Sequence, residues 1–291
     1  MKIHDVLRIG ELFVAKGWST ETDGDEQFPL LFDKFCRMSA RLDEVERKLV
    51  IQLSYDYVRV PPRDNAKALA TSWAKLIQSL PSTIKTIVLA PLPKPKGKKR
   101  SETNQIKSSD ALFYDARGIE ARLRRGITTD LVFCANADDF IDAQTASEPT
   151  ALVLIDDYVG SGNTASTAIA HLQSKALRSN THIFILALVA QTDAVARVQA
   201  SNAQLIAGRL VERAISNNTA IVNKIAALAT MHEIGRRLRF KKADALGYEG
   251  TEAVITMRRT PNNTFPVFWT DRKIDGQVWD SPFTRFTKSV F

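Results

Sequence analysis

Apolar residues recur at spacings of three and four through the first part of the chain. The longest series comprises Leu31, Phe35, Met38, Leu42, Val45, Leu49, Leu53 and Tyr57. Residues at these spacings share one face of a helix, so the series predicts one long amphipathic helix. Pro61-Pro62 ends it, and a second helix is predicted from Asp64 to Leu80. Residues 1–82 are therefore expected to form a mainly helical segment.

The pattern changes after residue 83, where short apolar runs alternate with helical stretches. The runs are Ile84 to Leu89, Leu131 to Cys134, Ala151 to Ile155 and Thr181 to Val189. This alternation predicts an α/β fold with a mainly parallel sheet flanked by helices. A further helical stripe from Ile221 to Leu238 is expected to cover one face of the sheet. We predict that residues 1–82 pack on an α/β domain of residues 83–291.

The apolar run from Ala151 to Ile155 ends at two carboxylates, Asp156 and Asp157. The run is short and uncharged, which is typical of a buried strand in a parallel sheet. Ligands of open parallel sheets bind beyond the carboxyl ends of the strands. The two aspartates are therefore candidate ligand-binding residues.

A turn with two glycines follows the aspartates directly. Gly160 and Gly162 let several backbone N–H groups face one small space, and Ser161 and Thr164 add hydroxyl donors. A helix is predicted to begin there, so its positive end faces the same space and favours a phosphate. Carboxylates beside an anion repel it unless they hold hydroxyl groups or a divalent metal on the same ligand. A sugar phosphate fits both features.

The segment Asp156-Asp157-Tyr158-Val159-Gly160-Ser161-Gly162-Asn163-Thr164 resembles the signature of the phosphoribosyltransferase family. The resemblance implies a type I phosphoribosyltransferase-like fold, and it implies that residues 160–164 hold the 5′-phosphate of 5-phosphoribosyl-1-pyrophosphate. Asp156 and Asp157 would then be catalytic residues that face the ribose hydroxyls. They would contact Mg²⁺ directly, or through those hydroxyls or water. Gly160 departs from the acidic residue usual in purine-salvage members, which disfavours purine salvage.

The first predicted strand of the sheet opens into a basic loop. In phosphoribosyltransferases the loop after this strand receives pyrophosphate. The resemblance therefore places Lys107, as a catalytic residue, and Ser108 near the leaving group, with Lys94 to Arg100 as a second candidate. The alternative is a solvated basic surface loop.

The C-terminal part carries a second resemblance, in Leu246-Gly247-Tyr248, in Pro261 to Trp269, and in Trp279 to Arg285. These segments look like those of phosphoribosyltransferase-like proteins of bacterial conflict systems, including proteins encoded beside retron reverse transcriptases. The resemblance implies a C-terminal hood over residues 244–291. Asn262 and Asn263 offer amide groups suited to reading a base. The alternative is a turn beside an aromatic core.

The formal net charge of +8 indicates anionic partners, and both a phosphorylated sugar and nucleic acid fit it. The positive charge gathers in Lys94 to Arg100, Arg122 to Arg125 and Arg236 to Lys242. Cys36 and Cys134 lack CxxC spacing and are expected to be buried thiols. No signal peptide or membrane-spanning stretch is apparent, so we expect a cytoplasmic protein without membrane contact.

These features favour a phosphoribosyltransferase-like enzyme, a transferase or a hydrolase, that binds 5-phosphoribosyl-1-pyrophosphate with Mg²⁺. The C-terminal resemblance implies that it is the toxic effector of a retron-type antiphage system. Its partner would be a reverse transcriptase with its DNA–RNA product, bound through the basic clusters. The alternative is a non-catalytic module that senses a phosphoribosyl ligand or binds nucleic acid. Housekeeping nucleotide salvage is a third hypothesis, and the acceptor substrate stays open.

Overall fold

The computed structural model describes residues 2–21, 27–93, 108–142, 148–175 and 177–285. The chain divides into two compact units. The sheet unit comprises residues 62–211, and the helical unit combines residues 1–61 with residues 212–291. This division differs from the predicted boundary at residue 82, because the second predicted helix joins the sheet and the C-terminal part joins the N-terminal helices.

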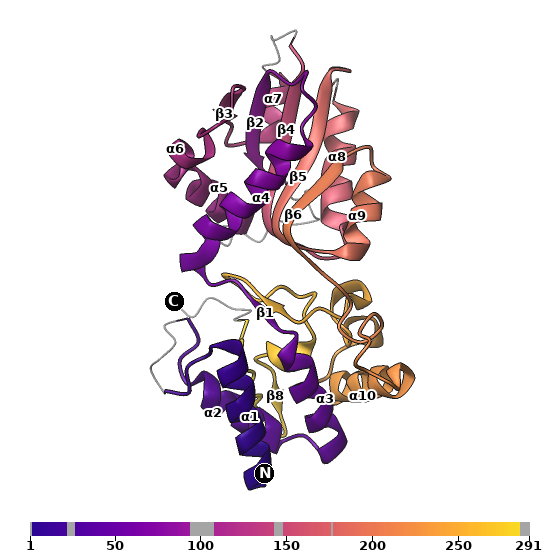
Figure 1. Ribbon diagram of the computed structural model, residues 1–291. Helices are drawn as coiled ribbons and strands as arrows, with labels where there is room; N and C mark the ends of the chain where they lie inside the picture. Colours follow the sequence, from indigo (N-terminus) through magenta and orange to yellow (C-terminus); the bar gives the residue numbers. More distant parts are fainter. Residues whose placement is uncertain (1, 22–26, 94–107, 143–147, 176, 286–291) are drawn as a thin grey trace. The chain divides into compact units, whose positions relative to one another are not determined.

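The sheet unit is built on five parallel strands in the order β3-β2-β4-β5-β6 (Figure 1). They are β2 (Thr86–Pro91), β3 (Asp130–Phe133), β4 (Thr150–Val159), β5 (Thr181–Gln191) and β6 (Gln204–Val211). The predicted α/β class and the parallel sheet are confirmed. β4 continues past its predicted end at Ile155, because Tyr158 and Val159 still pair with β5.

Helices cover the two faces of this sheet (Figure 1). One layer consists of α4 (Asn65–Ser79), α5 (Ser108–Gly118) and α6 (Glu120–Leu123), and the other of α7 (Ala137–Asp142), α8 (Asn163–Ser174) and α9 (Thr192–Gln199). In the first layer Trp73 Nε1 of α4 donates to Leu123 O at 2.9 Å. In the second layer Ile169 of α8 and Val198 of α9 pack in one cluster with Leu152 and Leu154 of β4. Burial of apolar strand residues on both faces explains the uninterrupted apolar runs of the sequence.

The helical unit contains α1 (Ile3–Lys16), α2 (Leu31–Ala40), α3 (Glu44–Tyr55) and α10 (Lys224–Arg237). The single long helix predicted over residues 31–57 is wrong, since α2 and α3 are separate. Asp43 caps α3: its Oδ1 accepts from Glu46 N at 2.9 Å, and its own N donates to Glu46 Oε2 at 2.9 Å. Val45, which the helical stripe placed inside, is 66% exposed.

The helix predicted near residues 221–238 forms as α10, but it does not cover the sheet. Met231 and Ile234 of α10 belong to the same apolar cluster as Leu49 and Leu53 of α3. The 3.6-residue pattern shows which face of a helix is buried and leaves open what covers it. The prediction of its packing partner is therefore wrong.

Short elements complete the helical unit. β1 (Val58–Arg59) pairs in parallel with β7 (Ile255–Thr256), and β8 (Lys273–Ile274) pairs antiparallel with β9 (Gln277–Val278). The 3-10 turns are η1 (Pro62–Asp64), which belongs to the sheet unit, and η2 (Lys242–Asp244), η3 (Tyr248–Gly250) and η4 (Pro266–Phe268). Phe283 stacks on Tyr57 with ring centroids 4.4 Å apart, which ties the C-terminal part to the N-terminal helices.

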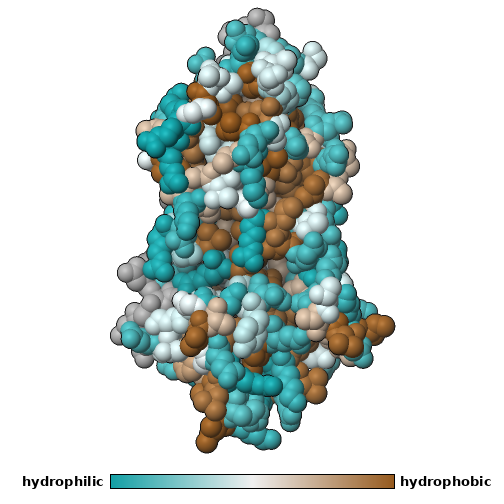
Figure 2. Space-filling model, viewed as in Figure 1, coloured by the Kyte–Doolittle hydropathy of each residue, from teal (hydrophilic) through white to brown (hydrophobic). Residues whose placement is uncertain are grey.

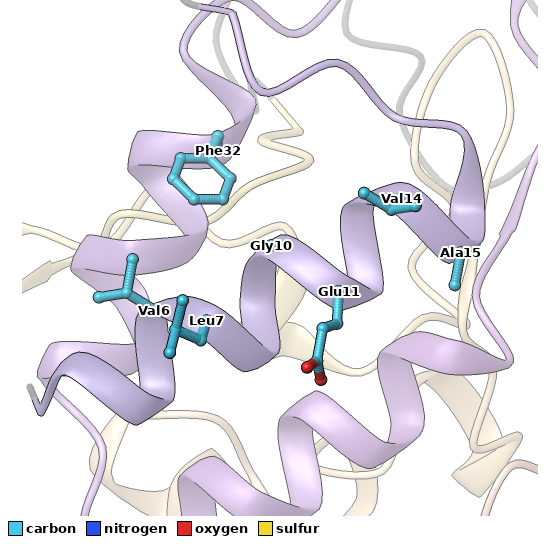
Figure 3. Close-up of a pocket in the computed structure, with 7 residues that line it drawn as sticks. All are labelled: Val6, Leu7, Gly10, Glu11, Val14, Ala15 and Phe32. Atoms are coloured by element: carbon cyan, nitrogen blue, oxygen red, sulfur yellow. The ribbon is translucent and has the colours of Figure 1, made fainter.

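Apolar side chains remain exposed on α1, where Ile3, Leu7 and Val14 are 62% to 81% exposed. Figure 2 shows hydrophobic colour where α1 begins and near the start of α10. A hollow of about 600 Å³ lies over Gly10 of α1, beside Phe32 of α2 (Figure 3). Its lining is almost wholly apolar, so it does not suit a sugar phosphate. Within the described ranges, no helix is long and apolar enough to span a membrane.

Candidate functional site

Asp156 and Asp157 lie on β4 at the switch point of the sheet. The chain passes from β2 to β3 on one side and from β4 to β5 on the other, so β2 and β4 flank the point where the strand order reverses. Pairing between them ends at Pro91 opposite Ile155, one residue before Asp156. Open α/β sheets bind ligands in the crevice at this point. The acidic pair therefore lies where a ligand is expected.

Both aspartates are buried, with 7% and 9% of their surfaces exposed. Ser108 Oγ, at the first residue of α5, donates to Asp156 Oδ1 at 3.2 Å. The backbone N–H of Asp157 donates to the same oxygen at 3.0 Å. The structure thus brings the start of α5 to the acidic pair, and a contact of Ser108 with pyrophosphate stays a prediction. These contacts orient the Asp156 carboxylate at the carboxyl edge of the sheet.

The turn after β4 leads directly into α8. Gly162 has φ +79°, and a Cβ at this position would lie 3.3 Å from Ala194 Cα and Cβ of α9. Glycine is therefore required by both the backbone angle and the neighbouring helix. Ser161 Oγ accepts a bond from Asn163 N at 3.4 Å. Since the first N–H groups of a helix have no acceptor within it, the start of α8 provides donors for an anion.

The remaining turn residues differ in exposure. Gly160 is buried, whereas the side chains of Asn163 and Thr164 are exposed. Because Gly160 has no side chain, the turn can stay close to β4. The exposed Thr164 hydroxyl and Asn163 amide lie at the beginning of α8. The predicted phosphate-binding residues 160–164 thus comprise the turn after β4 and the first two residues of α8.

Tyr158 is a polar residue near the pair that sequence reasoning did not single out. Its side chain is 8% exposed, and its hydroxyl has no hydrogen-bond partner among the described residues. Burial raises the pKa of Tyr158 above the ordinary value, so the hydroxyl stays protonated at neutral pH. In the sequence, Tyr158 stands out only by its position between Asp157 and Val159. That position is typical of an apolar strand residue and does not indicate a function.

The other predicted site residues are not among the described residues of the sheet unit. Lys107 and the segment 94–100 fall outside the described residues, so their roles stay predictions. Asn262 and Asn263 belong to the helical unit, where Asn262 O accepts from Tyr248 N at 2.9 Å. Asn263 is buried, and its Nδ2 donates to Thr251 Oγ1 at 3.2 Å. The Asn263 side chain thus has a structural contact, whereas the bond of Asn262 uses its backbone, and base recognition by the two asparagines remains a prediction.

The two described basic clusters take part in ion pairs. In the sheet unit, Arg124 Nε lies 2.8 Å from Glu120 Oε1. In the helical unit, Arg237 Nη2 lies 2.8 Å from Glu46 Oε2. Local carboxylates thus compensate part of the charge that the sequence offers to nucleic acid.

The geometry of the sheet unit agrees with a match to a known family. A sequence profile of the PRTase-CE family matches residues 78–285, which is more than half of the chain. The chain belongs to the PRTase-CE family. PRTase abbreviates phosphoribosyltransferase, so the family confirms the resemblance carried by residues 156–164. No curated protein matches the sequence significantly.

Solved structures also resemble the PRTase-CE chain. A hypothetical protein from Neisseria gonorrhoeae with bound ppGpp is 10% identical, covering 54% of this chain and 85% of that one, with a TM-score of 0.34. Hypoxanthine-guanine phosphoribosyltransferase from Schistosoma mansoni, in complex with IMP, is 17% identical, covering 54% and 69%, with a TM-score of 0.34. A Helicobacter pylori xanthine-guanine-hypoxanthine phosphoribosyltransferase is 12% identical, covering 53% and 84%, with a TM-score of 0.29.

Similarity at this level carries no argument. The parallel sheet with helices on both faces, together with the family match, gives a type I phosphoribosyltransferase-like fold. The predicted fold class is confirmed.

Proposed function

We propose that the sheet unit binds a 5-phosphoribosyl ligand, with 5-phosphoribosyl-1-pyrophosphate as the leading candidate, and that the protein transfers or hydrolyses the phosphoribosyl group. The observation that carries the proposal is the buried pair Asp156 and Asp157, directly before the glycine turn that begins α8. Carboxylates accept hydrogen bonds from vicinal hydroxyls, and a helix N-terminus binds phosphate. One sugar phosphate uses both.

The same residues suit the chemistry of phosphoribosyl transfer. When pyrophosphate leaves C1, positive charge develops on the ribose ring. Asp156 and Asp157 would hold the ribose hydroxyls and place negative charge near that ring. The N–H groups of residues 160–164 would fix the 5′-phosphate, which limits the motion of the sugar relative to the acceptor.

The donor set fits a Mg²⁺ ion that the ligand itself helps to hold. Among the described residues, no group of three or more His, Cys, Asp or Glu side chains could by itself hold a metal ion. Mg²⁺ in phosphate chemistry is bound by one or two carboxylates together with phosphate oxygens and water, and Asp156 and Asp157 supply such a pair. When bound, the ion would neutralise charge on the leaving pyrophosphate.

Isothermal titration calorimetry with ribose 5-phosphate and with 5-phosphoribosyl-1-pyrophosphate, each with Mg²⁺, tests the proposal. Replacing both Asp156 and Asp157 with Asn should weaken binding by about tenfold or more, because the hydroxyls lose charged acceptors. Asp130→Asn is the matched control, since Asp130 is an exposed residue at the amino end of β3 in the same sheet. Equal affinity in the double variant and the control would remove the site assignment.

The alternative is a module that senses the ligand, or binds nucleic acid, without chemistry. Such a module needs only the acidic pair and the glycine turn, and no site for an acceptor. Release of pyrophosphate from 5-phosphoribosyl-1-pyrophosphate separates the two readings. Binding without release by the full chain, with candidate bases or water as acceptors, would support the sensing module.

We further propose that the protein acts in the cytoplasm as the toxic effector of a retron-type antiphage system. The support is the resemblance of the three C-terminal segments within residues 246–285 to conflict-system proteins. Its partner would be a reverse transcriptase carrying a DNA–RNA product, held by arginines of 122–125 or 236–242. Expressed alone, the protein should slow bacterial growth, and the partner should relieve this. An Asp157→Ala variant as toxic as the parent would separate toxicity from the ribose-phosphate site.

A further inference from the structure

Within the described residues, the segment of β4 that carries the acidic pair is held by strand pairing on one side only. Pairing with β2 ends at Ile155. Pairing with β5 continues from Ala187 opposite Asp156 to Ala190 opposite Val159. The backbone position of the acidic pair therefore depends on where β5 lies.

Next to the acidic pair, the strand pairing of β4, β5 and β6 is interrupted along one row of residues, Asp157, Leu188 and Gly208. The pairing of β4 with β5 passes over Asp157 and Leu188, and the pairing of β5 with β6 passes over Leu188 and Gly208. Backbone groups that leave the ladder need other partners when they are buried. Side chains of a neighbouring helix can therefore hold the strands in place by hydrogen bonding to the backbone along this row.

Two side chains of α4 bind carbonyl groups in this row. Ser72 is fully buried, and its Oγ lies 2.8 Å from Ala187 O and 3.1 Å from Ala68 O of its own helix. A hydroxyl has a single proton, and the shorter distance favours the bond to the strand. One turn along the helix, Lys75 Nζ lies 3.1 Å from Ala207 O and 2.7 Å from Gly208 O.

Gly208 provides the space for this contact. A Cβ on Gly208 would lie 2.7 Å from Ser72 Oγ and 2.9 Å from Leu188 O. Any other residue would push α4 away from β5 or displace the strand. The glycine thus lets the Ser72 hydroxyl reach Ala187, the residue paired with Asp156.

We propose that Ser72 is a positioning residue for the ribose-binding aspartates: through Ala187 it fixes the part of β4 that carries Asp156 and Asp157, with Gly208 leaving room for it. This inference rests on the proposed phosphoribosyl site. It separates two parts of binding. The ribose part depends on Ser72, whereas the phosphate part depends on residues 160–164 and α8.

The test compares ribose 5-phosphate with inorganic phosphate on the purified full chain by calorimetry, below the melting temperature of each variant. Ser72→Ala should weaken ribose 5-phosphate binding on the order of tenfold and leave phosphate binding unchanged. Thr71→Ala is the matched control, because its exposed hydroxyl contacts only Lys67 O of its own helix among the described residues, at 3.2 Å. It should change neither affinity.

A double-mutant cycle adds an independent measurement. Gly208→Ala should weaken ribose 5-phosphate binding, since its Cβ meets the Ser72 hydroxyl. In the double variant that hydroxyl is gone, so the combined effect should be smaller than the product of the two fold-changes. If Ser72→Ala does not fold, Lys75→Met takes its place, because Lys75 is exposed and binds the same row.

Three results would overturn the inference. Unchanged ribose 5-phosphate affinity in Ser72→Ala, while the double aspartate variant loses affinity, removes the positioning role and keeps the proposed site. Equal weakening of both ligands shows a general loosening of the sheet unit. A parent protein that binds phosphate but gains no affinity from the ribose removes the proposed function, and the role of Ser72 with it.

Discussion

Each unit of this protein buries carboxylates, and the two places use them differently. In the helical unit, Glu252 is 2% exposed and accepts from Ile215 N at 3.1 Å, from Ser216 N at 2.7 Å and from Ser216 Oγ at 2.6 Å. All three donors belong to one neighbouring loop. Glu252 also has φ +51°, a strained angle that those bonds help to maintain. Its carboxylate therefore ties two segments of the fold together.

In the sheet unit, Asp156 and Asp157 are nearly as buried, yet their surroundings differ. They stand at the switch point of a parallel sheet, next to a glycine turn and the start of α8. Burial and hydrogen bonding alone do not distinguish a binding carboxylate from a structural one. Strand topology and the adjacent glycine turn are what distinguish the proposed binding pair from Glu252.

The largest expected effect comes from removing the structural carboxylate, Glu252. Glu252→Ala leaves the donors of residues 215 and 216 without an acceptor, so the free energy of unfolding should fall by about 3 kcal/mol or more. Urea denaturation measures it. Glu233→Ala, which alters an exposed ion pair with Arg236, is the control and should change stability little. A Glu252→Ala variant as stable as the parent protein would show that this carboxylate does not stabilise the fold.

Gly162→Ala should have a smaller effect on stability and a specific one on binding. The left-handed angle of residue 162 costs alanine about 1 to 2 kcal/mol, and the new Cβ presses on Ala194. The start of α8 then shifts, so inorganic phosphate should bind more weakly. Thermal unfolding and calorimetry measure the two effects. A loss of stability with unchanged phosphate affinity would show that the turn does not hold the anion.

The acidic pair and its turn were predictable because they are local. Asp156 to Thr164 form one continuous segment whose residue types alone indicate the chemistry. The end of β4 was not predictable in the same way, since its continuation to Val159 depends on pairing with β5. β6 was missed because it is an edge strand in which Gly208 and the exposed Arg209 interrupt the apolar pattern.

The division into units escaped prediction for a similar reason. Helical periodicity indicates a buried face and not its partner, so the stripe of α10 fits the sheet as well as α3. The contact between Phe283 and Tyr57 joins the C-terminal part of the chain to the N-terminal helices. The sequence around either residue does not indicate this contact. The break between α2 and α3 did have a local signal, the capping pair Asp43 and Glu46.

A partly exposed carboxylate extends the comparison to acidic pH. Asp138 of α7 lies 3.0 Å from Lys175 Nζ and 3.1 Å from His171 Nε2. Burial alone would raise the pKa of Asp138, but the bonds and charges of Lys175 and His171 hold it below its ordinary value. Its stabilising contribution is therefore present above the unfolded pKa and lost as pH falls through the folded one.

Because this carboxylate is partly exposed, the contribution should stay below about 1 kcal/mol. Asp138→Asn should lower stability slightly near neutral pH and flatten its decline as the pH falls below the ordinary pKa of an aspartate. Urea titrations at several pH values measure the slope. A variant whose decline is as steep as that of the parent would show that other carboxyl groups dominate.

The smallest expected effect concerns Tyr158, the third polar residue at the end of β4. Its buried hydroxyl has no partner among the described residues, so Tyr158→Phe removes an unsatisfied donor and keeps the ring. Stability should stay the same or rise by up to about 1 kcal/mol. Ribose 5-phosphate affinity should not change if the site consists of the acidic pair and the turn. Weaker binding by a variant of undiminished stability would instead show that the hydroxyl contacts the ligand. Tyr158 would then belong with Asp156 and Asp157 to the binding residues of β4.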